Sequence, residues 1–226
     1  MKTSVVNWMG RQFVVVSSES GLEGTPAEQA SDVFSRIGDE LSSLGLSLEH
    51  GVRTRLFARG QEARKVASDE RIKALAGGKR CASSSFIAPG YLDSQGIVAV
   101  DLIAMAQGDP ASLKTTVEYD PPRYPPHYVR WDDLVFFSGV TSPEGDLEHQ
   151  VRHLAAMLGG SLATVGATWD NVISASFFLR RDQDLDSLRS LWSPVLSAPI
   201  PYTSTTLVDG FASEGNLLEI EITAAV

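Results

Sequence analysis

The sequence contains one cysteine, Cys81, so it excludes an intramolecular disulfide and is typical of a reducing compartment. It has no apolar run of eighteen residues and no basic segment followed by an apolar stretch at its start, so we expect neither a membrane span nor a secretion signal. Basic residues are scarce: 19 Lys and Arg against 28 Asp and Glu give a net charge of −9. This charge argues against nucleic acid and anionic membranes as main partners. We therefore expect a cytoplasmic protein, in which any carboxylate-binding site needs local positive charge.

Common catalytic signatures are also missing. No phosphate-binding glycine loop, nucleophile elbow or zinc signature occurs in the sequence. His149 and His153 lie four residues apart on a predicted helix, but no third candidate ligand lies nearby, so a surface pair is the better interpretation. We predict neither a metal nor an organic cofactor.

An internal repeat with an offset of 121 residues is the strongest positive feature of the sequence. The stretch FVVVSS, which begins at Phe13, is similar to LVFFSG, which begins at Leu134. The same offset relates three further pairs, which are Gln29 and Gln150, Gly45 and Gly166, and Phe57 and Phe178. The chain is therefore expected to contain two domains of the same fold.

Each half shows the same order of predicted elements. After the first strand, apolar residues at spacings 0, 3, 4, 7, 11 and 14 predict a helix with one buried face, from Ala30 to Leu44 and again from Val151 to Val165. Second strands are predicted at 51–58 and 171–179, second helices at 66–75 and 185–196, and last strands at 97–105 and 217–224. Each half is therefore expected to form a sheet with two helices.

Proline divides the two halves. The segment DPPRYPP begins at Asp120 and cannot pair within a central strand, so we interpret it as part of a stiff connector. The predicted domains are residues 1–107 and 125–226, with the connector at 108–124.

These motifs resemble the RidA/YjgF family of reactive-intermediate deaminases. The second half carries the closer match, through DDLVFFSGV, SASFFLRRDQDLDSL, PYTSTTLV and LLEIEITAAV; the first half matches through RQFVVVSS and KRCASSSFIAP. The resemblance implies an α+β fold, chorismate-mutase-like, with a curved sheet covered by two helices on one face. It also implies domains arranged around a three-fold axis with small-molecule clefts between them. Single-repeat members hydrolyse enamines and imines to keto acids and ammonia without a cofactor.

The resemblance also implies which residues act. The family arginine that binds the substrate carboxylate falls on Arg80 in the first half and on Thr203 in the second, and a threonine cannot form a bidentate ion pair. The family glutamate that positions or activates water falls on Glu219, with Ala99 as its counterpart. The first half therefore keeps the arginine and lacks the glutamate, whereas the second half keeps the glutamate and lacks the arginine. Either the two halves complete one composite site, or both sites have decayed by drift.

Other family positions are less clear. Ser138 and Gly139 could offer backbone N–H donors to an oxyanion, or could form an ordinary turn. The family tyrosine falls on Pro125, with Tyr124 and Tyr128 nearby. The residues assigned to catalysis are Glu219 and Arg80, and those assigned to substrate binding are Arg80, Ser138, Gly139, Thr203, Tyr128 and Arg180.

Several of these residues also have a structural interpretation. Arg180 and Arg181 could replace the missing arginine, but ion pairs with Asp182, Asp184 and Asp186 are the favoured interpretation. Glu219 and Glu221 share one face of the last strand and could both be solvent-facing. Cys81 lies beside Arg80, and a buried structural thiol is favoured over a reactive one.

Three functions follow from the resemblance. The leading one is hydrolysis of an enamine, an imine or a related small carboxylate-bearing metabolite, with release of ammonia. The second is a chorismatase-like reaction, by analogy of fold alone. The third is a non-catalytic metabolite-binding or assembly protein. A homo-oligomer, most simply a trimer of tandem chains, is expected in each case because the family closes its clefts between domains.

Overall fold

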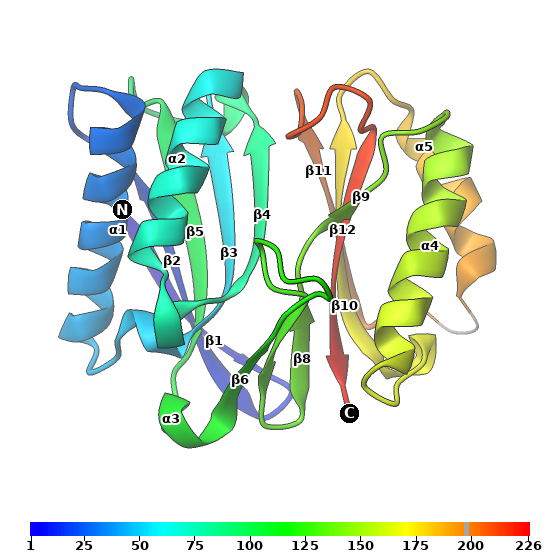
Figure 1. Cartoon of the computed structure of the whole chain (residues 1–226), viewed down its shortest axis with the longest axis horizontal. Helices are drawn as coiled ribbons and strands as arrows, with labels where there is room; N and C mark the ends of the chain where they lie inside the picture. The colour runs from blue at the N-terminus through cyan, green and yellow to red at the C-terminus, as the bar shows by residue number, and fades with distance from the viewer. Residues whose placement is uncertain (197–198) are drawn as a thin grey trace.

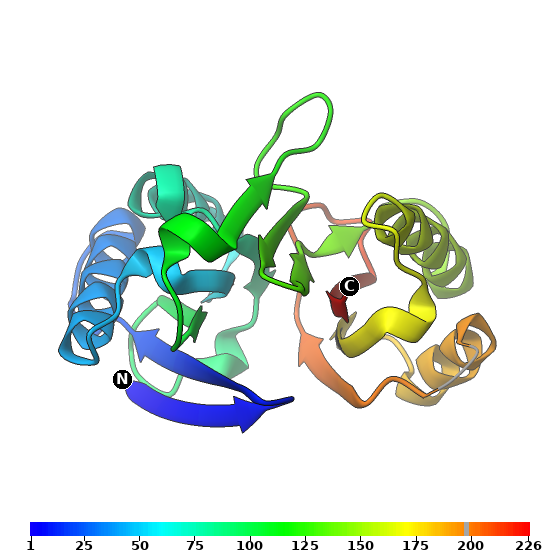
Figure 2. The same cartoon turned by 90° about the horizontal axis from the view of Figure 1, so that it is seen from below.

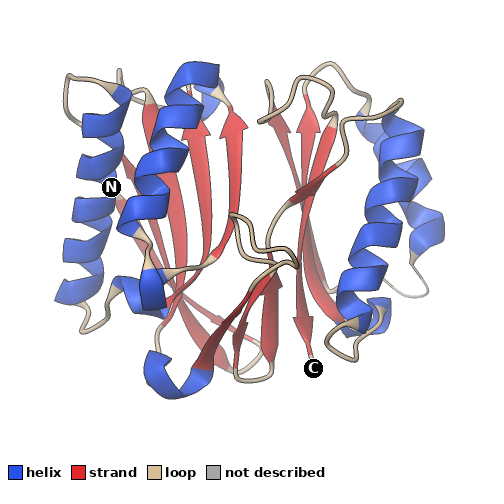
Figure 3. Ribbon diagram, in the orientation of Figure 1, coloured by secondary structure: helices blue, strands red, loops and turns tan. Residues whose placement is uncertain are grey.

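Two sheets face each other at the centre of the molecule, and the long helices lie on the two outer sides (Figures 1 and 3). The computed structural model describes residues 1–196 and 199–226. The layers therefore run helices, sheet, sheet, helices, as two α+β domains packed through their sheets. No helix in the described residues is long and apolar enough to span a membrane.

The first domain has five strands in the order β1-β2-β5-β3-β4. Its strands are β1 (Lys2–Trp8), β2 (Arg11–Glu19), β3 (Gly51–Ala58), β4 (Ala82–Ile87) and β5 (Val98–Met105). Its helices are α1 (Pro26–Ser43) and α2 (Gln61–Ala74). The side chains of Thr25 and Glu28 cap the start of α1 reciprocally, and Gly45, with φ of +74°, follows its end.

The second domain repeats this plan in the order β11-β10-β12-β8-β7-β6, with β9 paired to β12. Its strands are β6 (Lys114–Val117), β7 (Tyr128–Trp131), β8 (Leu134–Phe137), β9 (Val140–Thr141), β10 (Val172–Arg180), β11 (Tyr202–Val208) and β12 (Leu218–Ala225). Its helices are α4 (Leu147–Ala163) and α5 (Leu185–Trp192), and the short α3 (Pro110–Leu113) precedes β6.

Strand pairing confirms that the two sheets are copies. β3 pairs parallel with β4 and antiparallel with β5, and β10 pairs in the same way with β11 and β12. Within each copy, the buried face of the first helix packs on its own sheet and forms a separate core. The predicted fold of two tandem domains, each a sheet with two helices on one face, is therefore confirmed.

Two segments differ from the expected arrangement. β1 is an exposed edge strand without an apolar run, so hydrophobic pattern alone does not mark it. Residues 114–117 were expected in the connector, but they form β6 and extend the second sheet beside β7. The proline segment itself lies outside the strands, as its missing N–H donors require.

The inner faces of the sheets form the interface between the domains. Phe86 of the first domain stacks on Phe178 of the second, with ring centroids 4.0 Å apart, and Phe57 packs against Phe86 from within its own sheet. A further apolar cluster joins Phe13 and Val52 to Phe136 and Ile173. Because apolar side chains of both sheets are buried against each other, the two domains pack as one unit.

Candidate functional site

Glu219 lies on β12 with its carboxyl group directed at the first domain. The alternation of the strand places Leu218 and Ile220 in the core of the second domain and Glu219 on the opposite face. The residue is 6% exposed. A Cβ built on Gly139 would lie 2.0 Å from Glu219 Oε1 and 2.3 Å from Ser84 Oγ, so the carboxyl group is enclosed between the two domains.

Burial decides the protonation state of Glu219. Loss of hydration raises the pKa of its carboxyl group from 4.5 to about 8, against the opposing effect of the nearby Ser84 hydroxyl. The negative charge of Glu221 raises the pKa further, while the positive charges of Arg71 and Arg64 lower it. Glu219 is therefore a neutral acid at neutral pH, and a small change in its surroundings lets it exchange a proton.

Two buried arginines on α2 face this carboxyl group from the first domain. Arg71 Nη1 donates to the carbonyl of Ser84 over 2.6 Å, and Arg64 Nη1 donates to the hydroxyl of Ser85 over 3.0 Å. Arg71 is 3% exposed, and the Nε atom of Arg71 has no hydrogen-bond partner among the described residues. Two guanidinium groups without an ion pair in the described chain give this part of the interface a positive charge.

These arginines were not predicted from the sequence, although a signal for them exists. Arg64, Ala67 and Arg71 follow the i, i+3, i+7 spacing of one helical face, and that face lies on the sheet. The 121-residue offset relates Arg64 to Leu185 and Arg71 to Trp192, which are apolar. Among the described residues, the arginines of this site come from the first domain and Glu219 comes from the second, so the repeat does not place the same groups at the equivalent positions.

Tyr124 of the connector completes the arrangement. Its ring lies 5.6 Å from the guanidinium carbon of Arg71 and 5.8 Å from that of Arg80, and burial raises the pKa of its hydroxyl group. In Figure 1 the connector passes in front of the interface, between β4 and β12. Tyr124, and not Tyr128, is therefore the tyrosine that faces the arginines.

The position of Arg80 differs from the expected register. Thr203 pairs with Ala175, and Thr54, the counterpart of Ala175, pairs with Ser83. The structural counterpart of Thr203 is therefore Ser83, and Arg80 lies three residues earlier, before β4 begins. Its guanidinium group forms a two-bond ion pair with Glu118, with Nη2 3.0 Å from Oε2. The charges that act on Glu219 come instead from Arg71 and Arg64.

Ser138 and Gly139 connect the domains. The Ser138 hydroxyl donates to the carbonyl of Pro126 over 2.6 Å and accepts from the N–H of Ser83 over 3.2 Å. The N–H of Ser138 donates to the carbonyl of His127, and the N–H of Gly139 donates to that of Ser83. Both backbone donors proposed for an oxyanion are therefore already bonded within the fold.

A substitution of Gly139 tests how tightly the Glu219 carboxyl group is enclosed. We expect Gly139→Ala to lower the free energy of unfolding by roughly 1–3 kcal/mol, because the new methyl group would overlap the Glu219 carboxyl group and the Ser84 hydroxyl. Urea denaturation of both proteins measures this difference. Gly160→Ala on α4 is the matched control, because a Cβ there meets no atom within 4 Å. Equal stability of the two variants would show that the enclosure is loose.

The remaining predicted residues lie away from Glu219. Tyr128 packs against Phe137, 5.4 Å between ring centroids, at the edge of the second core. Arg180 is bonded to Asp182 over 2.7 and 2.8 Å, which confirms the ion-pair interpretation, and Arg181 pairs with Asp209 instead of the expected aspartates.

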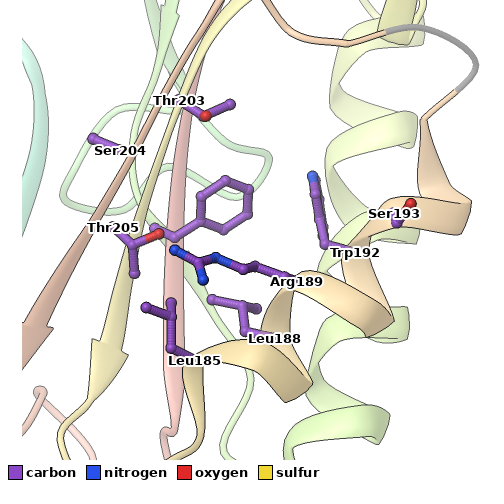
Figure 4. Close-up of a pocket in the computed structure, with 9 residues that line it drawn as sticks. Leu185, Leu188, Arg189, Trp192, Ser193, Thr203, Ser204 and Thr205 are labelled. Atoms are coloured by element: carbon purple, nitrogen blue, oxygen red, sulfur yellow. The ribbon is translucent and has the colours of Figure 1, made fainter.

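Thr203 faces the outer side of the second sheet. There it lines a cavity of about 380 Å³ between β11 and α5, together with Arg189 and Trp192. Figure 4 shows these side chains around the same space. Thr203 and Glu219 therefore face opposite sides of the second sheet.

Glu221 is buried, which corrects the solvent-facing alternative for this residue. It is 1% exposed and pairs with two arginines of β3: Arg55 Nε lies 2.9 Å from Glu221 Oε2, and Arg53 Nε lies 3.5 Å from the same oxygen. Burial would raise the pKa of Glu221, but the charges of Arg55 and Arg53 hold it below its usual value. This ion cluster (Arg53, Arg55, Glu221) joins the two sheets.

Cys81 lies in a core, and His149 and His153 lie on the surface. Cys81 is fully buried in the first core, and burial raises the pKa of its thiol, so the structural interpretation is confirmed. His149 and His153 lie on the exposed side of α4, as expected for a surface pair.

The raised pKa of Glu219 predicts how stability changes with pH. The folded chain keeps a proton that the unfolded chain releases, so this group stabilises the fold below pH 4.5 and loses that effect as pH rises to about 8. We expect the free energy of unfolding of the wild type, relative to Glu219→Gln, to fall by up to about 1.4 kcal/mol per pH unit over this window. Urea denaturation of both proteins at about pH 5 and about pH 8 measures the change. A difference that stays constant with pH would contradict the raised pKa.

Comparisons with known proteins agree with this architecture. The family model described as Endoribonuclease L-PSP matches residues 120–226. The RutC family protein YjgH of Escherichia coli (strain K12) is 30% identical over 105 residues, which cover 43% of this chain and 79% of that protein. A chorismatase crystal structure aligns with 100% of this chain and 80% of its own, at 18% identity and a TM-score of 0.68. A YjgF family member from Mycobacterium tuberculosis aligns with 50% of this chain and 99% of its own, at 23% identity and a TM-score of 0.45.

The chorismatase likeness covers both domains and shows the fold alone, because the identity is low. The relative from Escherichia coli is matched over most of its length, and its match falls within the size of one repeat. The two sheets with equivalent pairing account for the rest of the chain. The chain therefore belongs to the RidA/YjgF family and carries the family fold twice in tandem.

Proposed function

We propose that the chain hydrolyses an imine or enamine of a small carboxylate-bearing metabolite and releases ammonia, at the interface between its two domains. The observation that carries the proposal is Glu219: a buried carboxyl group with a pKa of about 8, opposite Arg71 and Arg64 of the other domain. A neutral acid next to positive charge is the combination needed to bind an anionic substrate and protonate its nitrogen.

The proposed reaction needs one acid that becomes a base. Glu219 donates its proton to the imine nitrogen, which makes the imine carbon electrophilic. Water then adds to that carbon while the Glu219 carboxylate accepts the proton that water releases. In the resulting carbinolamine a proton moves from the hydroxyl group to the amine, the C–N bond breaks, and the products are a keto acid and ammonia. An acid with a pKa near the working pH can perform both transfers.

The unpaired donors of the site support carboxylate binding. The Nε atoms of Arg71 and Arg80 are buried and have no partner among the described residues, and both guanidinium groups lie near the Tyr124 ring. Buried donors of this kind cost free energy unless a ligand or water bonds to them. Arg80 thus keeps its proposed role in binding the carboxylate, shared with Arg71, and Tyr124 has to move aside to admit the substrate.

The first experiment measures ammonia release from 2-iminobutyrate, generated in the cuvette by an amino-acid oxidase, with and without the purified chain. We expect a rate above the spontaneous one that scales with protein concentration. No acceleration, with tight binding of the matching keto acid, would replace catalysis by the metabolite-binding function. Release of pyruvate from chorismate would instead support the chorismatase-like reaction.

A further inference from the structure

A second cavity lies between the two sheets, away from the connector. It has a volume of about 350 Å³ and is bordered by β1 and β2 of the first domain and by β11 of the second. In Figure 2, β1 and β2 (blue) and β11 (orange) lie on one side of the molecule, and the loop between β6 and β7 (green) lies on the other. The cavity is therefore separate from the side of the interface where Tyr124 lies.

Arg53 and Arg55, the two arginines of the ion cluster with Glu221, line the floor of this cavity. Two guanidinium groups share one carboxylate within 4 Å, so within ion-pair distance these three residues have one positive charge more than negative charges. Burial lowers the pKa of Arg53 to about 10, which still leaves it charged at neutral pH. Asp101 lies opposite Arg55 in the register and adds negative charge near it, but no ion pair within 4 Å joins the two side chains in the described chain. The Asp101 carboxylate accepts a hydrogen bond from Tyr91.

Arg55 presents positive charge to the cavity. Its Nε atom donates to Glu221 and its Nη2 atom to the Ser176 hydroxyl over 3.0 Å, whereas Nη1 donates to no group in the described chain. The side chain is 22% exposed, and Arg55 and Ser176 both line the cavity. An oxyanion at Nη1 would form a charge-assisted hydrogen bond without displacing any existing partner.

The walls of the cavity are mostly apolar and aromatic. Trp8, Phe13 and Phe136 line it beside Tyr202, whose side chain reaches solvent at the mouth. A charged floor under apolar walls is the usual composition of a site for a small amphipathic ligand, and the volume is that of such sites.

We propose that this cavity binds a small organic anion, with its carboxylate on Arg55 and an aromatic-sized apolar body between β2 and β11. The site is independent of Glu219 and of the reaction proposed there. It would make the anion, which need not be the substrate, a ligand that contacts both domains at once.

The test uses 3-(4-fluorophenyl)propionate as the probe and its amide as the uncharged match, each titrated with the full chain and followed by fluorine NMR. We expect the carboxylate to bind at least about tenfold more tightly than the amide, because only the carboxylate forms an ion pair with Arg55. Arg55→Met is expected to remove this preference. Equal binding of the two probes to the wild type would overturn the proposal.

Val6 supplies a test that leaves the ion cluster intact. It lines the cavity from the edge strand β1 and is 42% exposed, so substitutions there keep the fold. We expect Val6→Glu to weaken carboxylate binding at least about fivefold by charge repulsion, while Val6→Gln of the same size changes it less than about twofold. Arg189→Met in the cavity between α5 and β11 is the control for binding elsewhere, and loss of binding in that variant would overturn the assignment.

A second copy of the chain could also cover this side of the interface. No probe binding, together with an oligomer in sedimentation that Val6→Glu dissociates, would assign the cavity to self-association and overturn the ligand site. Imine hydrolysis is expected to be unchanged in both Val6 variants, so failure of this inference and failure of the proposed function are distinguishable.

Discussion

Replacing Glu219 by glutamine is expected to lower the rate of ammonia release from 2-iminobutyrate by at least about 100-fold, because general acid–base catalysis by a positioned side chain contributes roughly 10²–10⁴-fold. Glutamine keeps the shape of the side chain but cannot transfer a proton. Since Glu219 is neutral at neutral pH, the substitution removes no charge from the interface. The measurement is the initial rate of ammonia release at saturating imine, with the spontaneous rate subtracted.

Glu214→Gln is the matched control for this loss. Glu214 lies in the exposed loop before β12, so the substitution changes a solvent-exposed carboxyl group of the same chain. We expect wild-type turnover in this variant. Full activity of Glu219→Gln would show that Glu219 takes no part in the reaction. An equal loss of ammonia release in both variants would indicate misfolded or inactive protein preparations.

Much of the fold could be predicted from the sequence because the repeat appears in residues that pack. The helix from Ala30 is buried at the predicted positions up to Leu41, and only Leu44, at the helix end, is exposed. Gly45 and Gly166 both have positive φ, as a left-handed helix end requires. These features are local, so spacing along the chain reveals them.

The composition of the site could be predicted only in part, because it depends on which faces meet. Alternation placed Glu219 opposite the core of its own domain, but only the docking of the first sheet turns that face into a buried one. The same docking turns Arg53 and Arg55, which resemble surface charges in the sequence, into the partners of Glu221. Such pairings join residues more than 160 positions apart and leave no mark in local spacing.

The predicted equivalence of Arg80 and Thr203 differs from the strand pairing for a related reason. The turn before β4 is built from Gly77 to Lys79, and strand pairing matches Thr203 with Ser83, three residues after Arg80. The role of Arg80 in binding a carboxylate stays a prediction. The trimer of tandem chains stays a prediction, because the structure describes one chain.

Replacing Glu221 by glutamine is expected to lower the free energy of unfolding by about 3–5 kcal/mol, the usual cost of removing one partner from a buried ion pair. The substitution leaves Arg53, which is 3% exposed, and Arg55 facing each other without a counter-ion at the junction of the two sheets. For a chain of this length the melting temperature is expected to fall by roughly 6–20 °C. Thermal unfolding followed by circular dichroism measures the change.

The double variant Arg53→Met with Glu221→Gln separates charge from packing. If the unpaired charge of Arg53 causes the loss, removing it as well should recover part of the stability, because Arg55 can be hydrated through the cavity that it lines. The exposed Glu214→Gln should stay within about 0.5 kcal/mol of the wild type. A Glu221→Gln variant as stable as Glu214→Gln would mean that water already hydrates the guanidinium groups at the interface. The two domains would then be held together by the aromatic contacts of Phe86 with Phe178 and not by the ion cluster.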